Sequence, residues 1–281
     1  METNRANKKQ IAENTLAILE AGFYQNGQGQ KVILHADVVN AKSHSKLFTE
    51  QDQSALWAKR NKLLNTNPTL ATVFKVQNAT TLQVCKELAL QGERIFCLNF
   101  ASAKNAGGGF LGGADAQEES LARASALYPC LLKFQTDFYQ YHQYGDTYYS
   151  DRMIYSPDVP VFKDDDGSLL DQPYYVSFLT SPAVNAGALQ QKKQYDAEKT
   201  DQVMLKRAEK LLSIAYVNGY ETLVLGAWGC GVFRQAPQNV AGYFARLLRE
   251  GGVFENRFRM IVFAILSRDE RNIFPFEQIF G

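Results

Sequence analysis

The sequence predicts a single α/β domain whose central sheet is covered by helices on both faces. From about residue 72 onward, apolar segments of strand length alternate with amphipathic segments of helix length. Two glycine-rich loops, at residues 105–113 and 226–231, each follow an apolar segment and precede a helical one. The 281 residues suffice for one large core, and no internal repeat or low-complexity linker divides them.

The first part of the chain, residues 1–70, is expected to form a helical extension packed on the main core. Residues 4–21 place apolar side chains at helical spacing and end before Gly22, a residue suited to a helix C-terminal cap. Residues 40–70 are mostly polar and end in a turn-like NTNPT. The prediction is therefore one domain over the whole chain, with the α/β core at residues 71–281.

The strands and helices of this domain follow from the spacing of apolar residues. Strands are expected at residues 31–34, 72–76, 94–100, 153–155, 159–162, 175–180, 222–225 and 259–266. Helices are expected at residues 80–90, 117–127, 197–216 and 237–249. The segment 134–150 is crowded with Phe and Tyr and has no clear period, so most of its rings are expected to pack against the sheet.

Composition narrows the chemistry. The chain has 30 Lys and Arg against 29 Asp and Glu, and this balance argues against a basic nucleic-acid-binding face. It contains neither a membrane-length apolar run nor an apolar stretch behind its first residues, so we expect a cytoplasmic protein. The three histidines and four cysteines form no metal-ligand spacing. We therefore expect no metal and no cofactor, with acid–base chemistry left to carboxyl groups.

The two glycine-rich loops favour a ligand that carries phosphate. Ligands of open α/β sheets bind outside the carboxyl ends of strands, and glycines there let backbone N–H groups approach a phosphate. The first loop matches G-x-G-x-x-G through Gly107, Gly109 and Gly112, but six residues separate it from the strand before it. No acidic strand end follows about twenty residues later, which disfavours a nicotinamide-dependent oxidoreductase. Neither loop contains Gly-Lys-Ser/Thr, so a nucleoside triphosphatase is excluded.

An acidic pair, Glu118 and Glu119, follows Gln117 at the start of a predicted helix. Asp115 and Glu118 fit an N-cap and N3 pattern, and acidic residues favour helix N-termini in any case. Taken alone, such a pair more often serves helix capping than catalysis. Consecutive helical positions point about 100° apart, so we expect the two carboxyls to have different tasks: one could cap the helix or hold a hydroxyl while the other faces the crevice.

The segment 99–119, NFASAKNAGGGFLGGADAQEE, resembles the signature of the microbial-type poly(ADP-ribose) glycohydrolases. That signature is three glycines, a spacer of about seven residues (here 110–116) and then Gln-Glu-Glu. The second loop, GAWGCGVF at 226–233, is similar to the diphosphate-binding loop of the macrodomain fold, and residues 11–24 also resemble the bacterial family. The resemblance implies a macrodomain-like three-layer α/β/α fold with a mixed central sheet and a helical N-terminal extension.

The resemblance also implies a reaction. Members of this family cleave the ribose–ribose O-glycosidic bond of poly(ADP-ribose) and release ADP-ribose without a metal. Carried over, Glu119 is the general acid/base, Glu118 hydrogen-bonds ribose hydroxyls, and Gln117 and Asn105 lie near the ribose. The ligand-binding residues implied in the two loops are Gly107, Gly108, Gly109, Gly229, Cys230, Gly231, Val232 and Phe233.

This assignment agrees with the chemistry that composition left available. Glycoside hydrolysis needs a protonated carboxylic acid at the leaving oxygen and requires neither histidine nor metal. The resemblance gives Phe233 the task of shaping the bound diphosphate, which can itself help orient the attacking water. Cys230 has no histidine near it in sequence, so we interpret it as a small residue beside a phosphate rather than a nucleophile.

Two alternatives stay open. The same site could remove a single ADP-ribose from a protein or from nucleic acid, because a neutral chain can still carry a local basic patch. A non-catalytic macrodomain that only binds ADP-ribose would need the glycine loops but not Glu119. The expected partners are ADP-ribose or poly(ADP-ribose) on modified proteins and, under one alternative, ADP-ribosylated nucleic acid. No membrane partner is expected, and the sequence does not indicate an oligomeric state.

Overall fold

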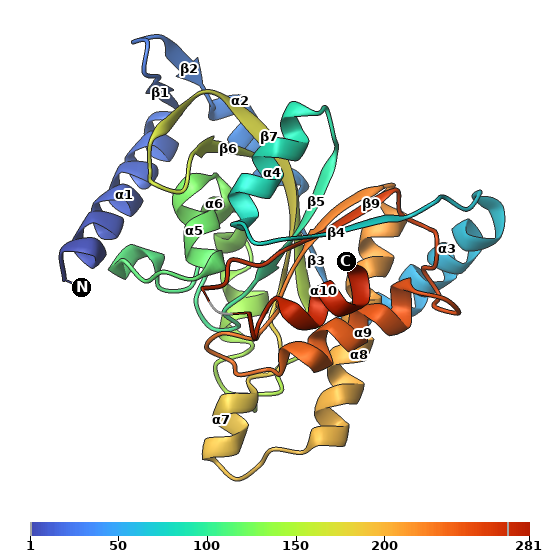
Figure 1. The fold of residues 1–281 in the computed structure, drawn as a ribbon. Coiled ribbons are helices and arrows are strands. Elements are labelled where there is room, and N and C mark those ends of the chain that lie inside the picture. Colours follow the sequence, from blue (N-terminus) through green and yellow to red (C-terminus); the bar gives the residue numbers. More distant parts are fainter. Residues whose placement is uncertain (1, 269) are drawn as a thin grey trace.

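The centre of the computed structural model, which describes residues 2–268 and 270–281, is a seven-stranded mixed sheet (Figure 1). Its strand order is β3-β6-β7-β5-β8-β9-β4. The strands are β3 (Lys46–Phe48), β4 (Val73–Gln77), β5 (Ile95–Phe100), β6 (Met153–Lys163), β7 (Leu169–Ser181), β8 (Thr222–Leu225) and β9 (Met260–Ala264). A separate two-stranded ribbon consists of β1 (Phe23–Gln25) and β2 (Lys31–Ile33).

Helices cover both faces of this sheet. They are α1 (Glu2–Ala21), α2 (His35–His44), α3 (Gln53–Thr66), α4 (Thr81–Leu90), α5 (Gln117–Ala124), α6 (Leu127–Leu132), α7 (Ala186–Gln191), α8 (Ala197–Val217), α9 (Pro237–Leu248) and α10 (Phe274–Phe280). A 3-10 turn at Phe110–Gly112 and a π-helical turn at Gln135–Gln140 complete the elements. In the described part of the chain, no helix combines the length and apolarity that crossing a membrane requires.

Two apolar cores, one on each face, separate the layers. Strand β5 alternates between them: Phe96 and Leu98 join the core under α3, α8, α9 and α10, whereas Ile95 and Cys97 join the core under α4, α5 and α6. Figure 1 shows these two groups of helices on opposite sides of the sheet. Because both faces are buried, β5 reads as a continuous apolar run. The predicted α/β class with a mixed, helix-covered sheet is confirmed.

The sheet is mixed because its two parts connect differently. Strands β4, β9, β8, β5 and β7 run parallel, and the chain passes through at least one helix between any two of them that follow one another in sequence. Strands β6 and β7 form an antiparallel hairpin, and β3 pairs antiparallel with β6 at the sheet edge. The strands predicted at 153–155 and 159–162 are one strand, with a register shift between Ser156 and Val159. The carboxyl ends of the parallel strands thus share one edge of the sheet.

The N-terminal region contains more structure than its polar sequence indicates. Helix α1 ends as predicted, at Gly22, whose φ of 76° and N–H bond to Ile18 O form a C-terminal cap. The segment 40–70 holds the end of α2, β3 and α3. Strand β3 pairs Leu47 with Ile154 of β6, so the first 70 residues supply an edge strand of the central sheet. Three residues are too few for a periodic signal, which is why this strand was not expected.

Candidate active site

A cavity of about 570 Å³ opens at the carboxyl ends of β4, β5, β8 and β9. The first glycine-rich loop follows β5 and the second follows β8, and residues of both loops line this cavity. The start of α5, which carries the acidic pair, lies between them on the cavity wall. Segments more than a hundred residues apart in sequence thus meet at the sheet edge where α/β proteins bind ligands.

The start of α5 is not capped as the sequence predicts. The N-cap residue is Ala116, and Asp115 makes no capping hydrogen bond, so the predicted capping role of Asp115 is wrong. Its carboxylate instead pairs with Arg123, at 2.8 Å, and with Lys8 of α1. Two cations offer a carboxylate stronger, charge-assisted hydrogen bonds than a backbone N–H does.

Gln117 ties α5 to the sheet. Its Oε1 accepts from Phe100 N at 2.8 Å, while its Nε2 donates to Leu98 O at 2.8 Å and to Thr81 Oγ1 at 3.3 Å. These bonds continue the backbone pairing of β5 where the strand ends. Gln117 lines the cavity, but its amide is bonded within the protein. These hydrogen bonds of Gln117 fix the position of the two glutamates that follow it.

Glu118 is a buried carboxyl, with 3% of its surface exposed. Its Oε2 accepts from Ser102 N at 2.6 Å, and its Oε1 accepts from Asn99 Nδ2 at 3.2 Å. The pKa of Glu118 is raised to about 8, mainly by burial; the charge of Glu119 also raises it, whereas the hydrogen bonds from Ser102 and Asn99 lower it. At neutral pH this carboxyl therefore holds a proton. Sequence reasoning missed both Asn99 and Ser102.

Glu119 is half-buried, and its Oε1 accepts from Gly109 N at 2.9 Å. A Cβ on Gly108 would overlap Glu119 Oε1 and lie 3.3 Å from Glu118 Oε2. The φ of Gly108, 61°, also favours glycine. Both carboxyls thus converge over Gly108 and both line the cavity. The two carboxyls nevertheless differ in burial and in hydrogen-bond partners, as two different tasks require.

The other predicted residues of the first loop either line the cavity or lie buried behind it. Asn105 is exposed on the cavity wall, and its carbonyl accepts from Gly108 N at 3.0 Å. Gly109 also lines the cavity, whereas Gly107 is buried behind it with a φ of 69°. A Cβ on Gly107 would come within 2.9 Å of the ring of Phe110. Gly107 therefore serves the turn rather than the cavity surface.

The second loop presents unoccupied backbone donors. Gly229 has a φ of 78°, and a Cβ there would lie 2.6 Å from the Cβ of Ala183. Within the described part of the chain, the N–H groups of Gly231, Val232 and Phe233 have no protein acceptor. Consecutive free N–H groups in a turn are a typical anion-binding arrangement. All five residues predicted in this loop line the cavity, Cys230 and Val232 among them.

Cys230 is not placed as a nucleophile. Burial raises the pKa of its thiol to about 12, so the reactive thiolate is absent at neutral pH. In the described residues, no group of three or more His, Cys, Asp or Glu side chains is arranged to hold a metal ion.

The aromatic segment packs as predicted. Phe138 and Tyr139 are fully buried against the sheet, and no residue of 134–150 is part of the cavity lining. One ring comes close: Tyr149 contacts Phe233, with 5.9 Å between ring centroids.

The cavity lining contains no Lys or Arg among the described residues. It contains four carboxyl side chains: Asp115, Glu118, Glu119 and Asp165. Asp165, in the turn between β6 and β7, accepts a hydrogen bond from Thr80 Oγ1 at 2.6 Å, and burial raises its pKa. Among the described residues, the lining therefore offers an anionic ligand uncharged donors, the free backbone N–H groups of the second loop among them.

The chain is similar to one family of known proteins. The family model described as microbial-type PARG, catalytic domain, matches residues 12–164. Poly(ADP-ribose) glycohydrolase (PARG) from Thermomonospora curvata is 40% identical over 100% of both chains, with a TM-score of 0.91. Its structure with the inhibitor ADP-HPD gives a TM-score of 0.88 over 99% of both chains at 40% identity. PARG from Deinococcus radiodurans in complex with ADP-ribose is 36% identical over 86% of this chain and 95% of that chain, with a TM-score of 0.78. No curated protein sequence matches significantly.

Proposed function

Because the chain belongs to the microbial-type poly(ADP-ribose) glycohydrolase family, we propose that it hydrolyses the ribose–ribose O-glycosidic bond of poly(ADP-ribose) and releases ADP-ribose. The observation that carries this proposal is the convergence of Glu118 and Glu119 over Gly108, in the same cavity as the free N–H groups of the second loop. At the first loop, the N–H groups of Ser102 and Gly109 donate to the two carboxyls, and others donate to carbonyls of the loop itself, which leaves the second loop to receive phosphate.

The proposed chemistry uses Glu119 as general acid and then as base. Its carboxylic acid gives a proton to the leaving ribose oxygen as the bond from that oxygen to the anomeric carbon breaks. Water then adds to the anomeric carbon and loses a proton to the Glu119 carboxylate. Gly109 N–H, which holds Glu119 Oε1, stabilises this carboxylate between the two steps. Glu118, which holds its own proton at neutral pH, is suited to hydrogen-bond a ribose hydroxyl without a second negative charge.

The remaining cavity suits the rest of an ADP-ribose unit. The N–H groups of residues 231–233 would hold the diphosphate, with the ring of Phe233 as the wall that bends it toward the ribose. In that bend the diphosphate can orient the attacking water, so a second catalytic carboxylate is not needed. Leu82, Phe100 and Ile265 form an apolar stretch of the lining that fits a flat base.

The test is a comparison of three glutamate variants. Glu119→Gln should lower the release of ADP-ribose from the polymer by about 10²–10⁴-fold, because the amide cannot donate the proton, while ADP-ribose still binds. Glu118→Gln should also lower turnover. Glu87→Gln, an exposed position on α4, is the matched control and should match wild type. Release of ADP-ribose is measured by chromatography, and binding of ADP-ribose by calorimetry. Undiminished release by Glu119→Gln would contradict the assignment of Glu119 as general acid.

Substrate choice is tested with three substrates in parallel. We propose that polymer on modified proteins is the preferred substrate, with mono-ADP-ribosylated protein and ADP-ribosylated DNA as comparisons. Faster release from either of the last two would assign the enzyme to single ADP-ribose units. Tight binding of ADP-ribose with no release from any of the three would make the protein a non-catalytic reader.

A further inference from the structure

A residue in an unusual backbone conformation stands directly behind the second loop. Tyr149 has a φ of 59°, in the left-handed region that residues with a side chain rarely adopt. Such a conformation persists only where its surroundings fix it, and it is typical of functional sites. Tyr149 does not line the cavity, so any effect on the ligand must pass through another residue.

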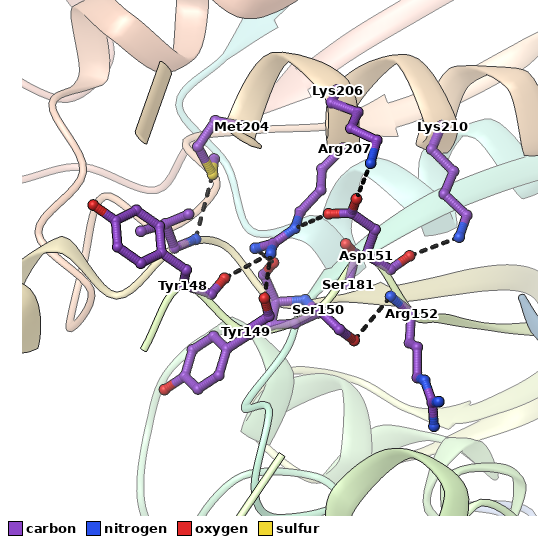
Figure 2. A network of polar contacts seen from close by, with 12 residues as sticks. Tyr148, Tyr149, Ser150, Asp151, Arg152, Ser181, Met204, Lys206, Arg207 and Lys210 are labelled. Atoms are coloured by element: carbon purple, nitrogen blue, oxygen red, sulfur yellow. Dashed lines mark hydrogen bonds and ion pairs between the residues drawn. The ribbon is translucent and has the colours of Figure 1, made fainter. Parts of the chain in front are cut away.

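Arg207 of α8 fixes this backbone (Figure 2). Its side chain is fully buried, and its Nη2 donates to Tyr148 O at 2.6 Å and to Tyr149 O at 3.0 Å. Its Nε donates to Asp151 Oδ1 at 2.9 Å, and its Nη1 donates to Pro182 O at 3.2 Å. One guanidinium thus holds two successive carbonyls and a carboxylate of the same short segment, and Asp151 balances its charge. These hydrogen bonds together fix the left-handed backbone conformation of Tyr149.

The consequence of this turn is the placement of one ring. The ring of Tyr149 lies 5.9 Å from that of Phe233, at 40°, and 5.8 Å from that of His142, at 89°. The backbone of Phe233 is fixed separately, because Gly187 N donates to its carbonyl at 3.0 Å. Tyr149 therefore supports the side chain of Phe233 from behind, while His142 supports Tyr149.

We propose that Tyr149, held left-handed by Arg207, is a positioning residue that sets the orientation of Phe233 and through it the shape of the diphosphate cradle. The proposal rests on the proposed function, since it gives Phe233 its ligand. It makes Tyr149 a determinant of ADP-ribose affinity although Tyr149 does not touch the cavity. Its effect should be absent when the ring of Phe233 is absent.

A double-mutant cycle tests this dependence. Tyr149→Ala should weaken ADP-ribose binding about tenfold, the scale of one lost aromatic contact. In a Phe233→Ala background, the same change should weaken binding less than about twofold. Tyr149→Phe keeps the ring and should bind like wild type. Tyr144→Ala, at an exposed tyrosine of the neighbouring loop, is the matched control. Additive losses in the double variant, measured by calorimetry, would overturn the proposal.

A second measurement needs no ligand and separates this proposal from the proposed function. With ring-labelled phenylalanine, the NMR signal of Phe233 in the free protein should shift or broaden in Tyr149→Ala and stay in place in Tyr149→Phe. An unchanged Phe233 signal in Tyr149→Ala would overturn the positioning role whether or not the protein hydrolyses the polymer. If the wild-type protein does not hydrolyse the polymer, but the double-mutant cycle and the NMR signals are as expected, only the catalytic assignment is contradicted. The positioning role of Tyr149 then still stands.

Discussion

Gly108 shows how much of the site depends on a single missing side chain. Its left-handed backbone and the two carboxyls packed over it leave no room for a methyl group. We predict that Gly108→Ala lowers kcat by at least about a hundredfold, because displacing a catalytic group by one ångström has that effect. Steady-state release of ADP-ribose from polymer measures it.

The control for this prediction is Gly29→Ala. Gly29 has a φ of 76°, so the variant carries a similar backbone penalty, but its added methyl group meets nothing within 4 Å. It should lose a little thermal stability and keep its kcat. Equal activity of the two variants would mean that the carboxyls do not need the space above Gly108.

The buried carboxyl of Glu118 predicts a dependence of stability on pH. Its pKa is about 8 in the folded protein and near the ordinary 4.5 in the unfolded chain. Between these values the folded protein still binds a proton that the unfolded chain has lost, so its contribution to the free energy of unfolding falls as pH rises and stays low above pH 8. Glu118→Gln removes this effect and should gain stability relative to wild type from pH 5 to pH 9, with an upper limit on the order of 4 kcal/mol.

Denaturant unfolding of both proteins at pH 5, 7 and 9 checks the sign. The difference between the two proteins isolates Glu118, because the other titrating groups are common to both. A constant difference across this range would show that Glu118 titrates in the folded protein as it does in the unfolded chain.

At this scale, the sequence revealed the residues whose signal is local. Glu118, Glu119 and the two glycine loops form contiguous patterns, and all of the ligand-binding residues predicted in these loops except Gly107 line the cavity. Asn99, Asp165 and Tyr149 were missed because their roles depend on neighbours far along the chain. A buried donor, a turn carboxyl and a left-handed tyrosine leave no periodic or motif signal.

At the scale of elements, α1 is bound to the loop that leads into α5. Arg5 Nε donates to Gly112 O at 2.8 Å, and Lys8 pairs with Asp115. Further along α1, Thr15 Oγ1 donates to the carbonyl of Arg123 at 2.5 Å. The helix at the start of the chain therefore holds the segment between the first glycine loop and the acidic pair.

We predict that Lys8→Ala lowers kcat and leaves the affinity for ADP-ribose unchanged. Loss of one of the two cations that pair with Asp115 loosens the residues just before the acidic pair without touching the diphosphate loop. The loss should be roughly fivefold, smaller than for a full ångström of misplacement. Lys9→Ala is the control, since Lys9 pairs with Glu13 on its own helix. A weaker Kd with an unchanged kcat would contradict this account of α1.

Element length decided what could be predicted. The long amphipathic helix α8 and the apolar strands β5 and β9 were located within a few residues. The helix expected at 117–127 is instead two helices, α5 and α6, because Ser125 turns extended and bridges to Val161. The short β3 and α10 depend on partners across the fold and have no strong signal of their own.

At the scale of the molecule, the sheet crosses the boundary we placed at residue 70. Strand β3 covers the edge of β6, and Arg60 of α3 pairs with Glu209 of α8. The buried ammonium of Lys210 donates to Thr49 O at 2.8 Å. A chain that starts at residue 71 would leave an open sheet edge and would remove partners of charged groups, including one or more of those of Lys210.

We therefore predict that residues 71–281 alone do not form a cooperative fold. The intact chain should unfold in one transition, whereas the fragment should aggregate or show no transition in circular dichroism and calorimetry. A soluble fragment that unfolds in one sharp transition would contradict this prediction, because it would show that residues 71–281 fold without the N-terminal region.

The absence of Lys and Arg from the described cavity lining affects how other nucleotides compete with the substrate for the site. Under the proposed function, a ligand with two phosphates followed by an uncharged sugar would place its sugar where Glu118 and Glu119 converge. ATP would direct a further phosphate at the same carboxyls, and among the described residues the cavity lining offers no Lys or Arg to neutralise it. We expect millimolar ATP to inhibit the release of ADP-ribose only weakly. With such weak inhibition, ADP-ribose would still be released in the presence of far more abundant nucleotides.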